Sequence, residues 1–219
     1  MPINFDFENV NITEFGLGLD SPNRGFVFVP VDEVVQKSLV EMVSFTKTQM
    51  QDKASSMATY QPSEKYASIE YLTFSINDPL VQELKNLHES ENVPEDCSAF
   101  DNINQCFAYF VKLTDNNQQR ITAVRRSTQF KTLIKKRNRL VQYVDNTLKS
   151  LEETVFKLDN DFDFIIQNDL IHILRPSGLE FTAQLQKAIM DAVPANIASI
   201  ASEIDFVNFD SISQYAQNH

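Results

Sequence analysis

Two short runs of strand-forming residues, joined by a turn, constrain the fold of this chain more than any other feature. Residues 105–113 (QCFAYFVKL) and 120–126 (RITAVRR) are rich in aromatic and β-branched types, and the intervening DNNQQ consists of turn formers. This pattern predicts an antiparallel hairpin. Residues 162–167 and 170–174 flank the tight turn at Asn168-Asp169 and predict a second hairpin.

Helical and extended segments alternate through the rest of the chain. Apolar residues from Val31 to Met50 recur at three- and four-residue spacing and predict an amphipathic helix. Asp78-Pro79 supplies an N-cap and a first-turn proline for a short helix that ends near residue 89. We further expect strands at 26–29, 67–76 and 154–158, helices at 130–141 and 179–192, and irregular chain at 1–25 and 52–65. The prediction is an α+β fold with a mixed, largely antiparallel sheet and flanking helices.

The length of 219 residues predicts one large domain or one domain with an appendage. We divide it into an N-terminal portion, 1–100, packed against an α+β portion, 101–219. A helix that starts near Phe209 stops at His219 without a C-cap signal, so we expect a fragment of a longer polypeptide. Cys97 and Cys106 form no disulfide framework and favour a reducing cytosol.

Positive charge is concentrated in one segment of this acidic chain, whose formal net charge is −11. No Asp or Glu occurs between residues 116 and 144. That segment holds eight of the 19 Lys and Arg residues, so the other 11 share the rest of the chain with all 30 acidic residues. The eight candidate binding residues are Arg120, Arg125, Arg126, Lys131, Lys135, Lys136, Arg137 and Arg139.

This basic segment has three interpretations. It can bind nucleic acid, dock on an acidic protein or membrane surface, or form an ordinary solvated helix face. The acidic rest of the chain would repel a nucleic acid and so favour its contact with the basic segment. Only Phe130 and Tyr143 are aromatic there, which argues against base stacking. We therefore favour contacts with the duplex backbone, without sequence readout.

Little in the sequence indicates catalysis. Four glycines are too few and too scattered to form a phosphate-binding loop. The best nuclease match, Glu83-Leu84-Lys85 after Asp78, falls on a predicted helix instead of a strand. We expect no catalytic residue, cofactor or small-molecule substrate, and a cryptic nuclease remains the enzymatic alternative.

The aspartates at positions 159, 161 and 163 raise the possibility of a metal site. An EF-hand loop starting at Asp159 requires Gly and Glu where Phe164 and Leu170 stand. We interpret this stretch as a polar turn before a strand, with an acidic metal pair as the alternative. His172 lies in an apolar strand and is expected to be a hydrogen-bonded sheet residue.

Residues 105–219, about half of the chain, resemble the KwaB-like domain family, which includes a component of the bacterial Kiwa anti-phage defence system. The resemblance rests on short motifs: Ala-Val-Arg at 123–125, the basic segment, Phe156-Lys157-Leu158-Asp159 with Phe162-Asp163, Ile173-Leu174, and Glu180-Phe181. Members usually continue as Ile-Leu-Asn, whereas Arg175-Pro176 follow Leu174 here.

The resemblance implies a cytoplasmic, dimeric DNA-binding protein with a longer chain. It also implies a small multi-pass membrane protein partner of the KwaA type, which would recruit it to the inner membrane. No catalytic residue is carried over. We expect a non-enzymatic, largely sequence-independent DNA-binding component of anti-phage defence. The alternatives are a scaffold that docks its basic stretch on an acidic or membrane-protein partner, and the cryptic nuclease.

Overall fold

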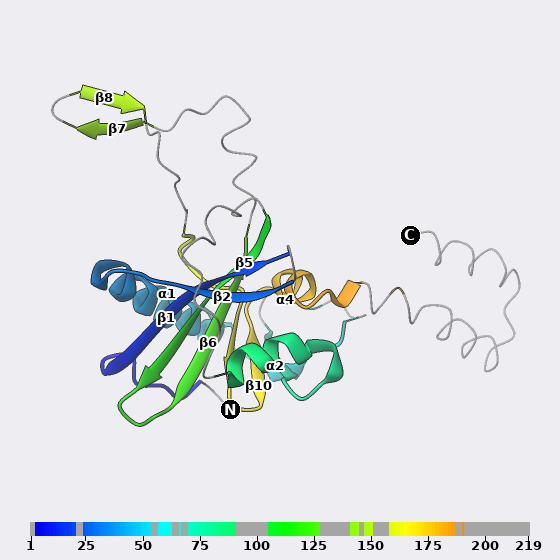
Figure 1. Cartoon of the computed structure of the whole chain (residues 1–219). Helices are drawn as coiled ribbons and strands as arrows, with labels where there is room; N and C mark the ends of the chain where they lie inside the picture. Colours follow the sequence, from blue (N-terminus) through cyan, green and yellow to red (C-terminus); the bar gives the residue numbers. More distant parts are fainter. Residues whose placement is uncertain are drawn as a thin grey trace, which may run out of the picture.

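The sheet at the centre of this computed structural model contains eight strands in the order β2-β1-β5-β6-β9-β10-β4-β3. Figure 1 labels β1, β2, β5, β6 and β10 among them. The structure describes residues 3–20, 24–53, 57–62, 66, 70–90, 105–127, 141–144, 147–150, 158–186 and 190. The sheet strands are β1 (Val10–Leu19), β2 (Gly25–Val29), β3 (Met57–Thr59), β4 (Tyr71–Ser75), β5 (Cys106–Asp115), β6 (Arg120–Arg126), β9 (Phe164–Gln167) and β10 (Leu170–Ile173).

Neighbouring strands in this sheet are antiparallel, except that β3 pairs in parallel with β4. Strands β7 (Val141–Val144) and β8 (Thr147–Ser150) form a separate antiparallel hairpin. The helical elements are α1 (Glu33–Asp52), η1 (Pro79–Val81), α2 (Gln82–Glu89) and α4 (Pro176–Thr182). The predicted α+β class and mixed, largely antiparallel sheet are confirmed.

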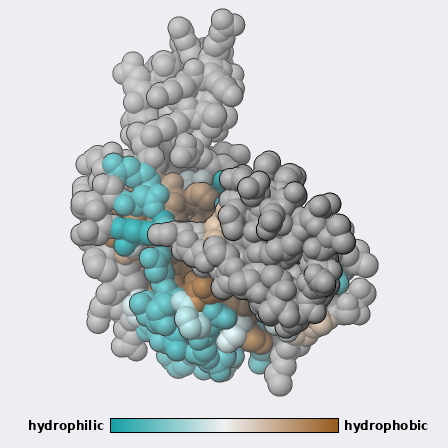
Figure 2. Space-filling view, turned by 90° about the vertical axis from the view of Figure 1, so that its right-hand side faces the viewer, coloured by the Kyte–Doolittle hydropathy of each residue, from teal (hydrophilic) through white to brown (hydrophobic). Residues whose placement is uncertain are grey.

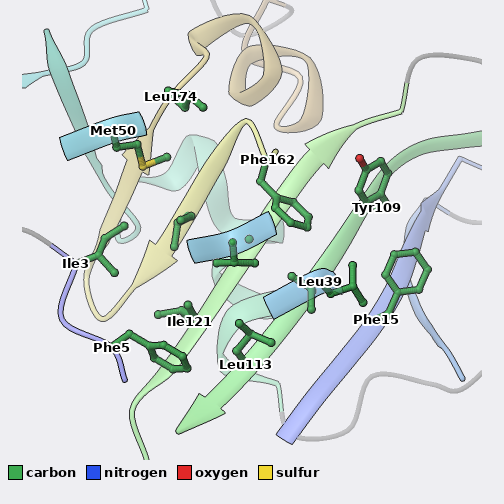
Figure 3. Packing of buried hydrophobic residues seen from close by; sticks show 14 of the residues in the cluster. Ile3, Phe5, Phe15, Leu39, Met50, Tyr109, Leu113, Ile121, Phe162 and Leu174 are labelled. Carbon is green, nitrogen blue, oxygen red and sulfur yellow. The ribbon is translucent and has the colours of Figure 1, made fainter. Parts of the chain in front are cut away.

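Apolar side chains cover both faces of the sheet. Helix α1 packs Leu39 and Val43 against one face, where they meet Tyr109, Leu113 and other residues of β1, β5 and β6 (Figure 3). Helices α2 and α4 cover the opposite face. All ten residues of β5 are buried, and the strand contributes side chains to the cores on both faces.

Two glycines in β1 make room for aromatic rings of β5. A Cβ atom on Gly16 would lie 2.2 Å from the carbonyl oxygen of Val27 and 2.4 Å from the ring of Phe110. A Cβ on Gly18 would lie 2.7 Å from the ring of Phe107. The rings therefore pack directly over the β1 backbone.

The sequence predicted both C-terminal hairpins, β2, the α1 helix and the η1–α2 segment, and the structure confirms them. The expectation of irregular chain at residues 1–25 was wrong, because β1 occupies ten of those residues. The glycines that admit the rings also weakened its strand signal. β3 was missed in the 52–65 loop, and β7 and β8 were missed too. Of the helix predicted at 130–141 and the strand predicted at 154–158, residues 130–140 and 154–157 lie outside the described residues.

Two histidines are buried in the sheet layers. Nδ1 of His88 on α2 lies 2.9 Å from the hydroxyl oxygen of Thr122, and Nδ1 of His172 on β10 lies 2.8 Å from the hydroxyl oxygen of Tyr71. Burial lowers the pKa of each imidazole to about 4, and for His88 the nearby charge of Lys112 contributes. The expectation that His172 is a hydrogen-bonded sheet residue is confirmed.

Replacing Gly16 by alanine tests the close packing over β1. We expect Gly16→Ala to lower the free energy of unfolding by about 1–3 kcal/mol, because its methyl group would overlap backbone as well as the Phe110 ring. The matched control is Gly25→Ala, since no atom lies within 4 Å of a Cβ there. Equal stability of the two variants in urea denaturation would contradict this account.

The buried histidines should make the fold sensitive to mild acid. Each is neutral in the folded chain and charges more readily when unfolded, so its contribution is fully present above pH 6.5 and is lost as pH falls toward 4. The loss is about 3 kcal/mol for each histidine. Urea denaturation between pH 7 and 5 should show that the free energy of unfolding depends less on pH in the double variant His88→Asn, His172→Asn than in the parent. Parallel curves would show that these residues do not titrate as proposed.

Candidate nucleic-acid interface

Neighbouring arginines at the end of β6 lie on opposite faces of the sheet. Arg125 is opposite Tyr109 on β5, and Arg126 is opposite Ala108. Since successive side chains of a strand point to opposite faces, Arg125 shares the face of Tyr109, which α1 covers. Arg126 shares the other face, and its guanidinium carbon lies 4.0 Å from the ring centroid of Phe181 on α4. The two charges therefore enter different surroundings.

Arg125 is held by three carboxylates. Its Nε donates to Asp159 Oδ2 at 3.2 Å, and its Nη1 donates to Asp161 Oδ1 at 3.1 Å and to Asp163 Oδ1 at 2.8 Å. Only 16 % of the Arg125 side chain is exposed, so these ion pairs are largely shielded from water. The hydroxyl of Tyr109 also donates to Asp159 Oδ2, at 3.3 Å.

Arg175 completes this group, which we call the aspartate cluster: Arg125, Arg175, Asp159, Asp161 and Asp163. Arg175 Nη2 donates to Asp161 Oδ2 at 2.6 Å, and its Nη1 lies 3.5 Å from Asp163 Oδ1. Three carboxylates and two guanidinium groups give the cluster a formal charge of −1. Its cationic side chains are thus committed to internal partners.

Asp163 connects the cluster to three elements of the fold. Its Oδ2 accepts from the backbone N–H of Arg126 at 2.8 Å, and its carbonyl oxygen accepts from the N–H groups of Leu174 and Arg175. A Cβ atom on Gly178 would lie 2.3 Å from Asp163 Cγ, so only glycine lets the start of α4 pack this closely. Asp163 therefore links β6, the end of β10 and α4.

Burial and charge oppose each other within the aspartate cluster. Burial raises the pKa of Asp163, although the Arg126 N–H and the two guanidinium groups favour its ionised form. Burial disfavours the charge of Arg125, but the carboxylates of Asp163 and Asp159 more than compensate and raise its pKa. Losing Arg125 would leave Arg175 as the only cation of the cluster beside three carboxylates in a poorly solvated place.

The basic residues that we predicted to contact phosphate differ in how exposed they are and in what they contact. Arg126 is exposed at the end of β6, whereas Arg120 is half-buried at the start of that strand, roughly 20 Å away. Arg125 has a structural role, because three carboxylates occupy its guanidinium. The remaining five candidates lie outside the described residues: Lys131, Lys135, Lys136, Arg137 and Arg139.

The nuclease pattern does not converge on a site. Asp78 Oδ1 accepts from the N–H of Leu80 at the start of η1, Glu83 pairs with Arg24, and Lys85 Nζ donates to an amide oxygen. Within the described part of the chain, no group of three or more His, Cys, Asp or Glu residues is arranged to hold a metal ion. The three aspartates bind arginines instead.

Sequence reasoning identified the alternating aspartates but missed their function. The partner Arg175 lies 12 positions after Asp163, at the end of another strand, and no local pattern joins the two. Phe181 was likewise missed as a partner of Arg126. Both pairings arise when β10 leads into α4 beside the end of β6.

Helices within the described residues lack the combined length and apolar character needed to cross a membrane. Comparison with protein families matches residues 103–219, more than half of the chain, to the family described as Kiwa protein KwaB-like. Searches of curated proteins and of solved structures gave no significant match.

Methionine substitutions distinguish the two neighbouring arginines. Arg125→Met should lower the free energy of unfolding by about 3–5 kcal/mol at pH 7, because three carboxylates lose their shared partner. The loss should shrink in acid, because burial raises the pKa of Asp163 and this carboxyl loses its charge as it takes up a proton. Arg126→Met, the matched control, should change stability by less than about 1 kcal/mol. Equal losses of stability in the two variants would show that Arg125 and Arg126 do not differ in their structural roles.

Proposed function

The chain belongs to the KwaB-like family of Kiwa proteins, and we propose that it is a component of anti-phage defence that binds the phosphate backbone of duplex DNA with little sequence preference. Family membership supports the place in defence. The binding mode rests on the charge distribution and on the side-chain environments at the end of β6.

The observation that carries this proposal is the segregation of charge. Eight basic residues occupy 29 acid-free positions in a chain of net charge −11. Phosphates on DNA attract such a segment, and the release of condensed counterions drives association. The acidic remainder repels DNA and so disfavours contact through other faces.

The aspartate cluster supports the part of this segment that lies at the end of β6. Arg125 is fixed between three carboxylates, while Arg126, the next residue, is exposed. The ion pairs of Arg125 therefore fix the position of the end of β6, where Arg126 lies. In this proposal Arg126 and the five basic residues from Lys131 to Arg139 contact phosphate, and Arg125 holds the base of the segment.

The partners follow from the family and are part of the same proposal. Membership supports work alongside another Kiwa protein, and we propose a small multi-pass membrane protein of the KwaA type. A homodimer would place two basic segments on one duplex and strengthen binding through effective concentration. The chain would act in the cytoplasm, recruited to the inner membrane by its partner, and without a catalytic step of its own.

Charge reversal tests the proposal. Changing Lys135, Lys136, Arg137 and Arg139 to Glu should abolish DNA binding measured by fluorescence anisotropy, because four phosphate contacts become repulsive. For the parent, log K against log salt should fall with a slope of about −4 to −5 per protomer if four to six phosphates are contacted. Shuffled sequences should bind alike.

A matched control separates local contact from net charge. Changing Lys37, Lys47, Lys53 and Lys85 to Glu alters the net charge by the same amount at positions outside the basic segment. This control should weaken binding only modestly. If the first variant binds DNA with unchanged affinity, the basic segment does not contact DNA and the scaffold role is favoured. If both variants lose the same affinity, net charge alone explains the loss.

A further inference from the structure

A cleft of about 330 Å³ opens beside the exposed end of β6. Among the described residues it is lined by Asp20, Arg24, Glu180, Phe181, Gln184 and Gln186. Figure 2 looks onto the right-hand side of the view in Figure 1 and shows apolar surface bordered by hydrophilic surface. The lining combines an aromatic ring, two carboxylates, two amides and one guanidinium, so the cleft offers both apolar and polar contacts.

The polar walls of the cleft are held in place. Arg24 pairs with Asp20 and, at 3.2 Å, with Glu83, and its Nη2 donates to the carbonyl oxygen of Thr182 at 2.7 Å. Its guanidinium also lies 3.6 Å from the ring centroid of Phe107. On α4, Glu180 accepts a 2.5 Å hydrogen bond from the buried hydroxyl of Tyr60. A ligand would meet walls that are already ordered.

Phe181 connects this cleft to the proposed DNA contact. Its side chain is 41 % exposed although it is large and apolar. The ring lines the cleft and also carries the guanidinium of Arg126 at 4.0 Å. A group stacked on Phe181 would therefore lie within reach of a phosphate held by Arg126.

The charges select the class of ligand. Asp20 and Glu180 outnumber Arg24 in the lining, so a phosphate would be repelled from the interior. Arg126 beside the ring disfavours a cationic peptide at the same place. A flat, neutral ring with amino donors suits the site, because carboxylates accept from the amino groups of bases and aromatic rings stack on them.

We propose that this cleft holds one unpaired nucleobase, stacked on Phe181, while Arg126 meets the adjacent phosphate. The inference rests on the proposed DNA-binding function and deepens it. It also revises the expectation that base stacking is unimportant, because the aromatic residue comes from α4 and not from the basic segment. DNA with unpaired bases should bind roughly tenfold more tightly than an intact duplex of equal length.

The test compares an intact duplex with the same duplex carrying a short single-stranded gap, both titrated by fluorescence anisotropy against the full chain. Phe181→Leu should remove the preference for gapped DNA, so that gapped and intact DNA bind with equal affinity. Phe181→Trp should keep the preference, because an indole ring still stacks. The control is Phe45→Leu, a 50 % exposed phenylalanine on α1, and it should behave like the parent.

Failure of this inference and failure of the proposed function give different results. Equal binding of gapped and intact DNA by the parent overturns the base site and leaves backbone binding in place. Binding of neither DNA overturns both. A basic peptide that binds the parent and is lost in Phe181→Leu, with DNA binding unaffected, would assign the cleft to a protein ligand instead.

Discussion

Pairing of β5 with β1 on one side and β6 on the other is the constraint on which the rest of the structure depends. All ten β5 residues are buried, and the strand supplies side chains to the cores on both faces of the sheet. β1 comes from the first part of the chain and β6 from the second, so β5 joins the two portions in one sheet. The N-terminal portion (1–100) and the C-terminal portion (101–219) therefore contribute side chains to the same two hydrophobic cores.

This pairing also positions the charged end of β6. Because strand side chains alternate, the register that puts Arg125 opposite Tyr109 puts Arg126 on the other face. One arginine is desolvated and needs carboxylates, which Asp159, Asp161 and Asp163 provide. The other stays exposed beside α4. Of these two adjacent arginines, Arg125 thus forms structural ion pairs and Arg126 is a candidate ligand contact.

The proposed functions share one physical basis, which is the confinement of positive charge to a limited surface. Carboxylates of the same chain pair with Arg125, Arg175 and Arg24. Arg126 is exposed, with an aromatic ring as its neighbour. A phosphate recognised there would bring its base toward the cleft along α4, so backbone attraction and base stacking would act on the same nucleotide.

Local sequence determined the hairpins, the α1 and α2 helices and the charge asymmetry, because strand alternation, helical spacing, turn residues and caps depend on near neighbours. It also showed that Asp159, Asp161 and Asp163 alternate, but gave no partner for them. Only the tertiary structure decided that Arg125 is bound and Arg126 exposed, and that Phe181 faces a cleft. It also decided that the glycine-containing β1 is a strand, since rings from β5 must pack over it. These features depend on contacts between residues distant in sequence, which no local pattern encodes.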